Sequence, residues 1–326
     1  MTKNELSALF RASLIYSRWH WFSYHFKMEL EGPGHPLAAG ILRSALECEA
    51  RMPGYAEELV KRISSICGLE KHLLDWEQLL TILAELHVVA QICRWGWPEG
   101  TTFEKEPIAS GSKRNPEIAV RVGNRTYGYE VKAPALFSHG EARGTNPIQV
   151  ASRFLDKDTL TRMVGDQGGV TWPRDNPVKD FLISAEKKFE PFVRADENFT
   201  GILVICWDDF IYEPISALDQ SSSGLLTPNS FYRTKSGEAV TFPSVSGIVV
   251  LRPLTQFVRA CQDKPLGDGL SGPFDYGPQN AFPWKTFHKN PASKDVPQDA
   301  IECLHAIPPT LMMGAEYRPQ EQVMWF

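Results

Sequence analysis

Hydrophobic and polar positions alternate most clearly between residues 118 and 132. Two β-prone runs, residues 118–122 and 126–132, flank Gly123-Asn124-Arg125, which is the pattern of a β-hairpin. Because side chains alternate along a strand, the second run has two different faces. One face carries Tyr127, Tyr129 and Val131, and the other carries Gly128, Glu130 and Lys132. We expect the first face to pack in a core and the second to leave room for a ligand.

Helical periodicity dominates the first hundred residues. It predicts helices over residues 2–31, 37–51 and 56–67, the first with a Thr2 and Glu5 capping box. Aromatic residues crowd the first of these, and core packing explains them, with a homodimer interface as the alternative. A stronger helix is predicted from Asp75, as its N-cap, to a stop at Gly96.

The second half of the chain adds a helix and two strands. Apolar spacing predicts a helix over residues 179–189, and the continuous apolar runs at 201–207 and 247–251 are typical of strands buried on both faces. The whole pattern indicates an α/β fold, with a mixed central β-sheet flanked by helices. We divide the chain into a helical N-terminal subdomain (1–74), a core (75–260, with an insertion at about 211–245) and an irregular C-terminal extension (261–326).

Composition narrows the class of protein. The chain has 326 residues, of which 43% are hydrophobic, so it can bury a full core in one or two domains. It has no run of 18 uncharged apolar residues and begins without a signal-peptide pattern, so we expect a cytoplasmic protein that does not enter a membrane. The six cysteines form no C-x-x-C pair, which favours free thiols over a zinc site.

The charge is unevenly distributed. The net charge is −5, but residues 105–190 carry 14 basic and 11 acidic side chains, and this positive segment contains the hairpin. Its basic residues are candidates for contacts with nucleic-acid phosphates, with solvated surface charge as the alternative for each. The candidates in the core are Arg121, Arg125, Arg143, Arg153, Lys187 and Lys188.

The candidate chemistry lies in the hairpin. Two acidic-x-Lys triplets occur in the chain, and a strand places Glu130 and Lys132 of one triplet side by side. The other, Glu186-Lys187-Lys188, lies on a predicted helix, where residues two apart do not face each other. The hairpin also brings Glu117, at the start of its first strand, near the end of the second. We therefore expect Glu117, Glu130 and Lys132 to converge.

These residues and their order resemble the PD-(D/E)XK superfamily of restriction-endonuclease-like nucleases. The resemblance covers roughly residues 76 to 260 and consists of a helix with Glu85, a strand near residues 102–108, Pro116-Glu117, the Glu130-Val131-Lys132 triplet, and then a helix and an apolar strand. It implies a restriction-endonuclease-like core. The chain departs from the family pattern at Glu117, where Asp is usual.

The resemblance also implies a role for each residue. Glu117 and Glu130 would bind Mg²⁺ or Mn²⁺, with the Val131 carbonyl as a third oxygen, and Lys132 would orient the attacking water. Glu85 would touch the metal shell, although a Glu at the border of an apolar stripe is most often a solvated residue. Hard oxygen ligands of this kind select Mg²⁺ or Mn²⁺ over softer metals.

Two functional hypotheses follow. The first is a Mg²⁺-dependent endonuclease that acts on DNA, with RNA as an open alternative. The second is a catalytically inactive nuclease-like domain that binds nucleic acid or supports assembly, for which the Glu at position 117 would be a sign of lost activity. By analogy with the family, a partner ATPase or sensor protein is a further expectation.

Overall fold

The computed structural model describes residues 1–326 except 110–111, 113, 151–161, 163–168, 280–281 and 312–326. Its centre is a six-stranded mixed sheet in the order β1-β2-β3-β6-β7-β8. The strands are β1 (Thr102–Lys105), β2 (Ile118–Val122), β3 (Arg125–Lys132), β6 (Phe199–Cys206), β7 (Gly247–Leu251) and β8 (Thr286–Lys289). The three strands β3, β6 and β7 run parallel, and the remaining neighbours are antiparallel.

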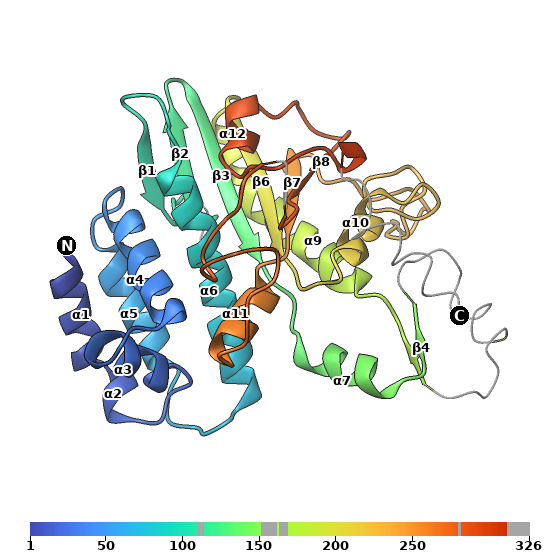
Figure 1. Cartoon of the computed structure of the whole chain (residues 1–326). Helices are drawn as coiled ribbons and strands as arrows, with labels where there is room; N and C mark the ends of the chain where they lie inside the picture. The colour runs from blue at the N-terminus through green and yellow to red at the C-terminus, as the bar shows by residue number, and fades with distance from the viewer. Residues whose placement is uncertain (110–111, 113, 151–161, 163–168, 280–281, 312–326) are drawn as a thin grey trace.

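Helices cover both faces of this sheet (Figure 1). On one face lies α6 (Leu73–Arg94), which packs against β3 on the side of Tyr127, Tyr129 and Val131 and is itself contacted by α11 (Leu254–Cys261). On the other face lies α9 (Asp175–Ala195), which packs with α10 (Tyr212–Asp219) against alternate residues of β6 and β7. The predicted mixed α/β fold is therefore confirmed at this level.

The predicted hairpin is formed by β2 and β3. Gly123 occupies the turn with φ of 59°, a left-handed conformation that suits glycine. Tyr127 and Tyr129 are fully buried on the α6 face, as the alternation predicts. On the opposite face, Gly128 lies directly beneath the ring of Phe199, because a Cβ at this position would be only 2.4 Å from the Phe199 Cζ. The glycine therefore gives room to a packed ring rather than to a ligand.

The N-terminal helices differ in part from the prediction. Residues 2–31 form three helices, α1 (Lys3–Ala12), α2 (Leu14–Ser17) and α3 (Ser23–Glu31), instead of one. Ser13 interrupts the first helix because its hydroxyl caps the second, accepting from the Ile15 N–H at 3.3 Å. The Thr2 and Glu5 capping box is confirmed.

The next helices are α4 (Pro36–Glu49) and α5 (Tyr55–Ser65), close to the predicted bounds. The motif helix α6 begins at Leu73 with His72 as its N-cap, so the prediction of Asp75 as the cap was wrong. Core packing accounts for much of the aromatic segment: Phe22 and Phe26 are fully buried, and Trp21 packs on Trp76 with ring centroids 5.0 Å apart.

The C-terminal part of the chain is more regular than predicted. It contributes β8 to the sheet, followed by α12 (Gln298–Glu302) and a short 3₁₀ turn, η1 (Pro309–Leu311). Strand β8 pairs with β7, and Thr286 and His288 are buried there. Residues 261–326 are thus not only an irregular extension, because they supply an edge strand of the central sheet.

The remaining elements lie near the ends of the parallel strands. After β3 come α7 (Phe137–Thr145) and a small two-stranded sheet of β4 (Ile148–Gln149) and β5 (Val170–Thr171). The predicted insertion at about 211–245 begins with α10. All six cysteines are free thiols, as predicted. In the part of the chain that the structure describes, no helix has the length and apolar character needed to cross a membrane.

The contact between Gly128 and Phe199 can be tested by substitution. We expect Gly128→Ala to lower the free energy of unfolding by about 1–3 kcal/mol, because the Phe199 ring is buried and stacked on Phe192 and has little room to shift. Gly96→Ala is the matched control, since a Cβ there meets nothing within 4 Å. Urea unfolding of both variants measures the difference, and equal stabilities would contradict the packing argument.

Candidate active site

The predicted charged residues of the hairpin lie together, and a lysine from α9 joins them. The Glu130 Oε1 atom is 2.6 Å from the Lys132 Nζ and 2.6 Å from the Lys188 Nζ. The Lys188 Nζ is also 3.6 Å from the Glu117 Oε1. Glu117 is held beside β3 by its backbone N–H, which donates to the Tyr129 carbonyl at 3.0 Å. The sequence therefore brings Glu117, Glu130 and Lys132 to one place, as predicted.

Local structure explains this convergence. Tyr129 and Val131 are buried against α6, so Glu130 and Lys132 must face α9 on the other side of β3. The Glu130 side chain has no exposed surface, whereas the Lys132 and Lys188 side chains keep 25% and 20% of theirs. A fully buried carboxylate is stable as an anion only when cations or hydrogen-bond donors neutralise it. The two ammonium groups meet that requirement.

Glu85 enters the same cluster from α6 but has its own partner. The Arg62 Nη2 atom, from α5, is 2.5 Å from the Glu85 Oε2. Burial raises the pKa of Glu85, against the opposing charge of Arg62, and the Glu130 carboxylate raises it further. Glu85 is therefore not the solvated edge residue that its position in the stripe most often indicates. Its predicted contact with a metal ion stays a prediction.

The pKa of Glu117 reflects the negative charge of the carboxylates around it. Burial, followed by the nearby carboxylates of Glu85 and Glu130, raises the pKa of Glu117 to about 8, although Lys188 and Lys132 act in the opposite direction. Three carboxylates, from β3, from the residue before β2 and from α6, thus share a poorly hydrated region. The ammonium groups of Lys132 and Lys188 offset part of this repulsion.

The oxygen donors can be compared with the needs of Mg²⁺. Both ammonium groups contact Oε1 of Glu130, and among the described residues Oε2 has no hydrogen-bond partner. No group of three or more His, Cys, Asp or Glu side chains within the described ranges is arranged to hold a metal ion. Mg²⁺, however, commonly binds through one or two carboxylates and keeps several waters. Glu117 and Glu130 are carboxylates of this kind, and both contact Lys188.

The other predicted phosphate contacts have varied surroundings. Arg121 is exposed on β2, and Lys187 is exposed on α9. Arg125 is ion-paired with Asp299 at 3.1 Å. Arg143 belongs to a separate ion-pair network. Arg153 lies outside the described residues.

A hollow of about 350 Å³ adjoins the cluster. It is lined by Arg114, Asp180, Ile183, Ser184, Lys187 and Lys188. Lys188 therefore borders both the carboxylates and this basic hollow, which is large enough for a phosphate group and its water. Arg114 lies only three residues before Glu117.

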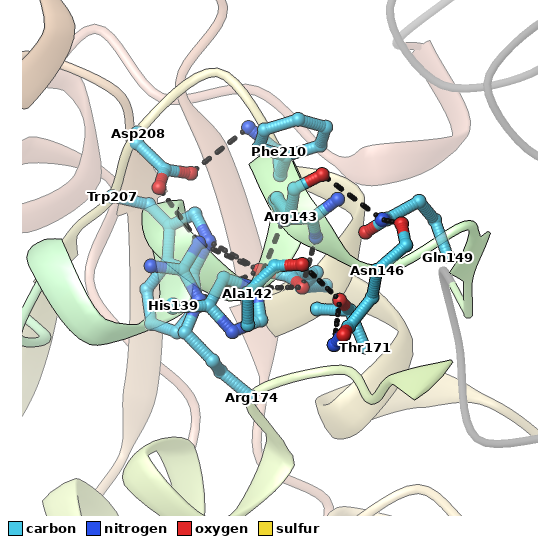
Figure 2. Close-up of polar contacts among 11 residues, drawn as sticks. His139, Ala142, Arg143, Asn146, Gln149, Thr171, Arg174, Trp207, Asp208 and Phe210 are labelled. Atoms are coloured by element: carbon cyan, nitrogen blue, oxygen red, sulfur yellow. Dashed lines mark hydrogen bonds and ion pairs between the residues drawn. The ribbon is translucent and has the colours of Figure 1, made fainter. Parts of the chain in front are cut away.

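A second charged network fixes the segments around the site. Glu213, fully buried, accepts from the Arg174 Nη2 at 2.7 Å and from the Trp207 indole at 3.1 Å, and it is also paired with Arg143 and His139. Figure 2 shows Arg143, Arg174, His139 and Trp207 gathered in one group. Helix α7 follows β3, and Arg174 is the N-cap residue of α9. This network therefore joins the segment after Lys132 to the start of the helix that carries Lys188.

Sequence reasoning missed three features of this region. The sequence indicates Lys188 only as a candidate phosphate contact, because its acidic-x-Lys triplet lies on a helix. Arg62 was not considered, because nothing in the sequence links residue 62 to Glu85. Glu213 was placed in an insertion. The apolar face of α9, with Leu182, Ala185 and Phe189 buried, was the one available signal, because it orients Lys188 relative to the sheet.

Comparison with known proteins adds no further constraint. No protein-family model, curated protein or solved structure matches the chain.

The Glu213 network predicts a pH-dependent stability. Burial alone would raise the pKa of Glu213, but the hydrogen bond with His139 and the charges of Arg174 and Arg143 outweigh it and hold the pKa at about 2. A carboxylate with a lowered pKa stabilises the fold above its ordinary pKa of 4.5, and this stabilisation is lost as the pH falls through about 2. We expect Glu213→Gln to cost about 3–5 kcal/mol at neutral pH, because the buried Arg174 keeps only Asp208, at 2.7 Å, as a charged partner and the half-buried Arg143 loses its carboxylate.

Urea unfolding between pH 7 and pH 2 tests this expectation. The difference in stability between wild type and Glu213→Gln should shrink below about pH 4.5. Glu190→Gln is the control, since Glu190 is about half exposed and paired only with Arg194 on the helix surface. A Glu213→Gln penalty that stays constant with pH would show that packing, and not charge, is lost.

Proposed function

We propose that this protein is a Mg²⁺- or Mn²⁺-dependent nuclease that hydrolyses phosphodiester bonds, with DNA as its substrate. The observation that carries the proposal is the convergence of Glu117, Glu130, Lys132 and Lys188 in a poorly hydrated region. When bound, the metal would lower the pKa of a water molecule and neutralise charge on the phosphoryl oxygens. Carboxylates beside an ammonium group are what such a reaction requires.

Each residue has a distinct role in this proposal. Glu117 and Glu130, with the Val131 carbonyl, hold the cation. Lys132, which keeps a quarter of its side-chain surface exposed, orients the attacking water and stabilises negative charge on the phosphate. Glu85 is held by Arg62 and acts on the cluster through its charge. The raised pKa of Glu117 adds support, because perturbed carboxyl groups are concentrated at functional sites.

The order of elements supports the same family. Helix α6, the antiparallel strands β1 to β3, helix α9 and the parallel strand β6 follow the order of the PD-(D/E)XK core. A fold by itself does not establish an activity. The proposal therefore depends on the charged cluster and uses the fold only as support.

One observation favours the alternative of an inactive binding or assembly module. The cluster is already balanced, because Arg62, Lys132 and Lys188 offset the three carboxylates. A site of this kind could remain folded without a metal ion. DNA is favoured over RNA only by the resemblance, and a homodimer through the N-terminal helices or a partner ATPase or sensor stays a proposal.

Cleavage assays test the proposal directly. Purified protein is incubated with plasmid, linear duplex, single-stranded DNA and RNA, with Mg²⁺, Mn²⁺ or a chelator. We expect metal-dependent cleavage by the wild type, and rates lowered at least about a hundredfold in Lys132→Ala and Glu130→Gln. Lys235→Ala, an exposed lysine in the predicted insertion, serves as the control and should retain full activity.

The alternative has its own signature in the same assay. If no substrate is cleaved with either metal while the protein still binds nucleic acid, the nuclease proposal is wrong and the binding module is supported. Cleavage that persists unchanged in Lys132→Ala would place the chemistry elsewhere.

A further inference from the structure

Lys188 lies between two different anion environments. On one side its Nζ is 2.6 Å from the Glu130 Oε1 and 3.6 Å from the Glu117 Oε1. On the other side Lys188 lines the 350 Å³ hollow with Arg114 and Lys187. No other residue among the described ones is a member of both the carboxylate cluster and the lining of this hollow.

The first environment is the place where a divalent cation would bind. An ammonium group that contacts the oxygen of a carboxylate repels a second cation at the same oxygen, and the repulsion is strong where water is scarce. Lys132 also contacts this oxygen but is fixed to β3, next to Glu130 itself. Lys188 comes from a separate helix and also lines the hollow, so it is the cation with a second anion site within reach of its four-carbon stem.

The second environment, the hollow, is suited to bind an anion that Lys188 can contact. Arg114 and Lys187 are both exposed, and neither has a charged partner in the described part of the chain. The one acidic residue in the lining, Asp180, is 3.4 Å from Lys179 on the same helix. The hollow therefore has an excess of positive charge, and the Ser184 hydroxyl adds a hydrogen-bond donor. A phosphate group of a nucleic-acid backbone matches this lining.

We propose that Lys188 exchanges between these two anions: it neutralises Glu130 and Glu117 when no divalent cation is bound, and it binds a substrate phosphate in the hollow when one is. The identity of this phosphate as part of a nucleic acid rests on the proposed function. The exchange makes binding of metal and of phosphate mutually favourable, because each frees Lys188 from competition with the other. Such coupling is reciprocal and typically amounts to 5- to 150-fold in affinity.

Equilibrium binding tests the exchange without any need for cleavage. Calorimetry measures the affinity of wild type, Lys188→Met and Lys235→Met for Ca²⁺ and Mn²⁺ alone. Fluorescence anisotropy measures the affinity of the same proteins for a short labelled DNA strand with and without Ca²⁺. Lys235→Met is the control, because Lys235 is an exposed lysine that lines neither environment. Lys188→Gln is a second variant, and thermal melting checks that each variant is folded.

The expected results differ between the two substitutions. Wild type and Lys235→Met should bind the strand about tenfold more tightly when Ca²⁺ is present. Both Lys188 variants should bind metal alone about tenfold more tightly than wild type, and their weaker binding of the strand should be independent of Ca²⁺. Loss of the competing ammonium explains the first change, and loss of the coupling residue explains the second.

Two results would overturn the proposal. One is a metal affinity in the Lys188 variants that is no higher than in wild type, which includes the case that no protein binds metal. The other is Ca²⁺-dependent strand binding that persists without Lys188. A wild type that shows the coupling but cleaves no substrate would support the exchange and reject the nuclease, so the two failures are distinguishable.

Discussion

The arrangement of this protein depends on the burial of one carboxylate. Glu130 lies in the middle of the structure with no exposed surface, and a buried anion without cationic partners costs several kcal/mol. Its partners come from two elements far apart in the sequence, β3 itself and α9, on the face of the sheet that α9 covers. Glu117 and Glu85 add two more carboxylates, and Arg62 brings α5 into the same group. The charge balance therefore links the N-terminal helices, the hairpin and α9 in a way that apolar packing alone does not specify.

Strand register is the second requirement. Because side chains alternate along β3, a slip of one residue would turn Glu130 and Lys132 toward α6 and Tyr129 and Val131 toward α9. The register is held on both sides, by antiparallel pairing with β2 and by parallel pairing with β6. The Glu213 network secures the ends of this arrangement, since it joins α7, just beyond Lys132, to Arg174 at the start of α9. One charged network thus forms the candidate site, and another holds the segments that carry it.

Local patterns in the sequence were sufficient to predict the hairpin and most of the helices. The two faces of β3 follow from alternation alone, and α9 follows from its apolar spacing. What the sequence could not supply were contacts between distant residues: Arg62 with Glu85, Lys188 with Glu130, and β8 with β7. Strand β8 is short and follows a segment rich in proline and glycine, so its strand character comes from pairing with a formed sheet and not from its own residues. The contact of Lys188 with Glu130 could not be predicted because the spacing of residues within α9 shows only which of them share a face of that helix. It does not show which residues of the sheet lie opposite.

The glutamate at position 117 bears on whether the site can hold a metal ion. Mg²⁺ requires ligand oxygens near 2.0–2.1 Å in an octahedral arrangement, so a longer side chain at a rigid position would misplace its oxygen. The two carboxylates are held differently, however: Glu130 has two ammonium groups at 2.6 Å, whereas the contact of Glu117 with Lys188 is 3.6 Å long. A loosely held glutamate can move toward a cation that a fixed carboxylate has already positioned. The extra methylene then costs side-chain entropy but does not misplace the ligand oxygen. The loss of entropy is the smaller of these two penalties. The departure from aspartate is therefore compatible with a functional metal site, provided that Glu130 sets the position of the metal and Glu117 adapts to it.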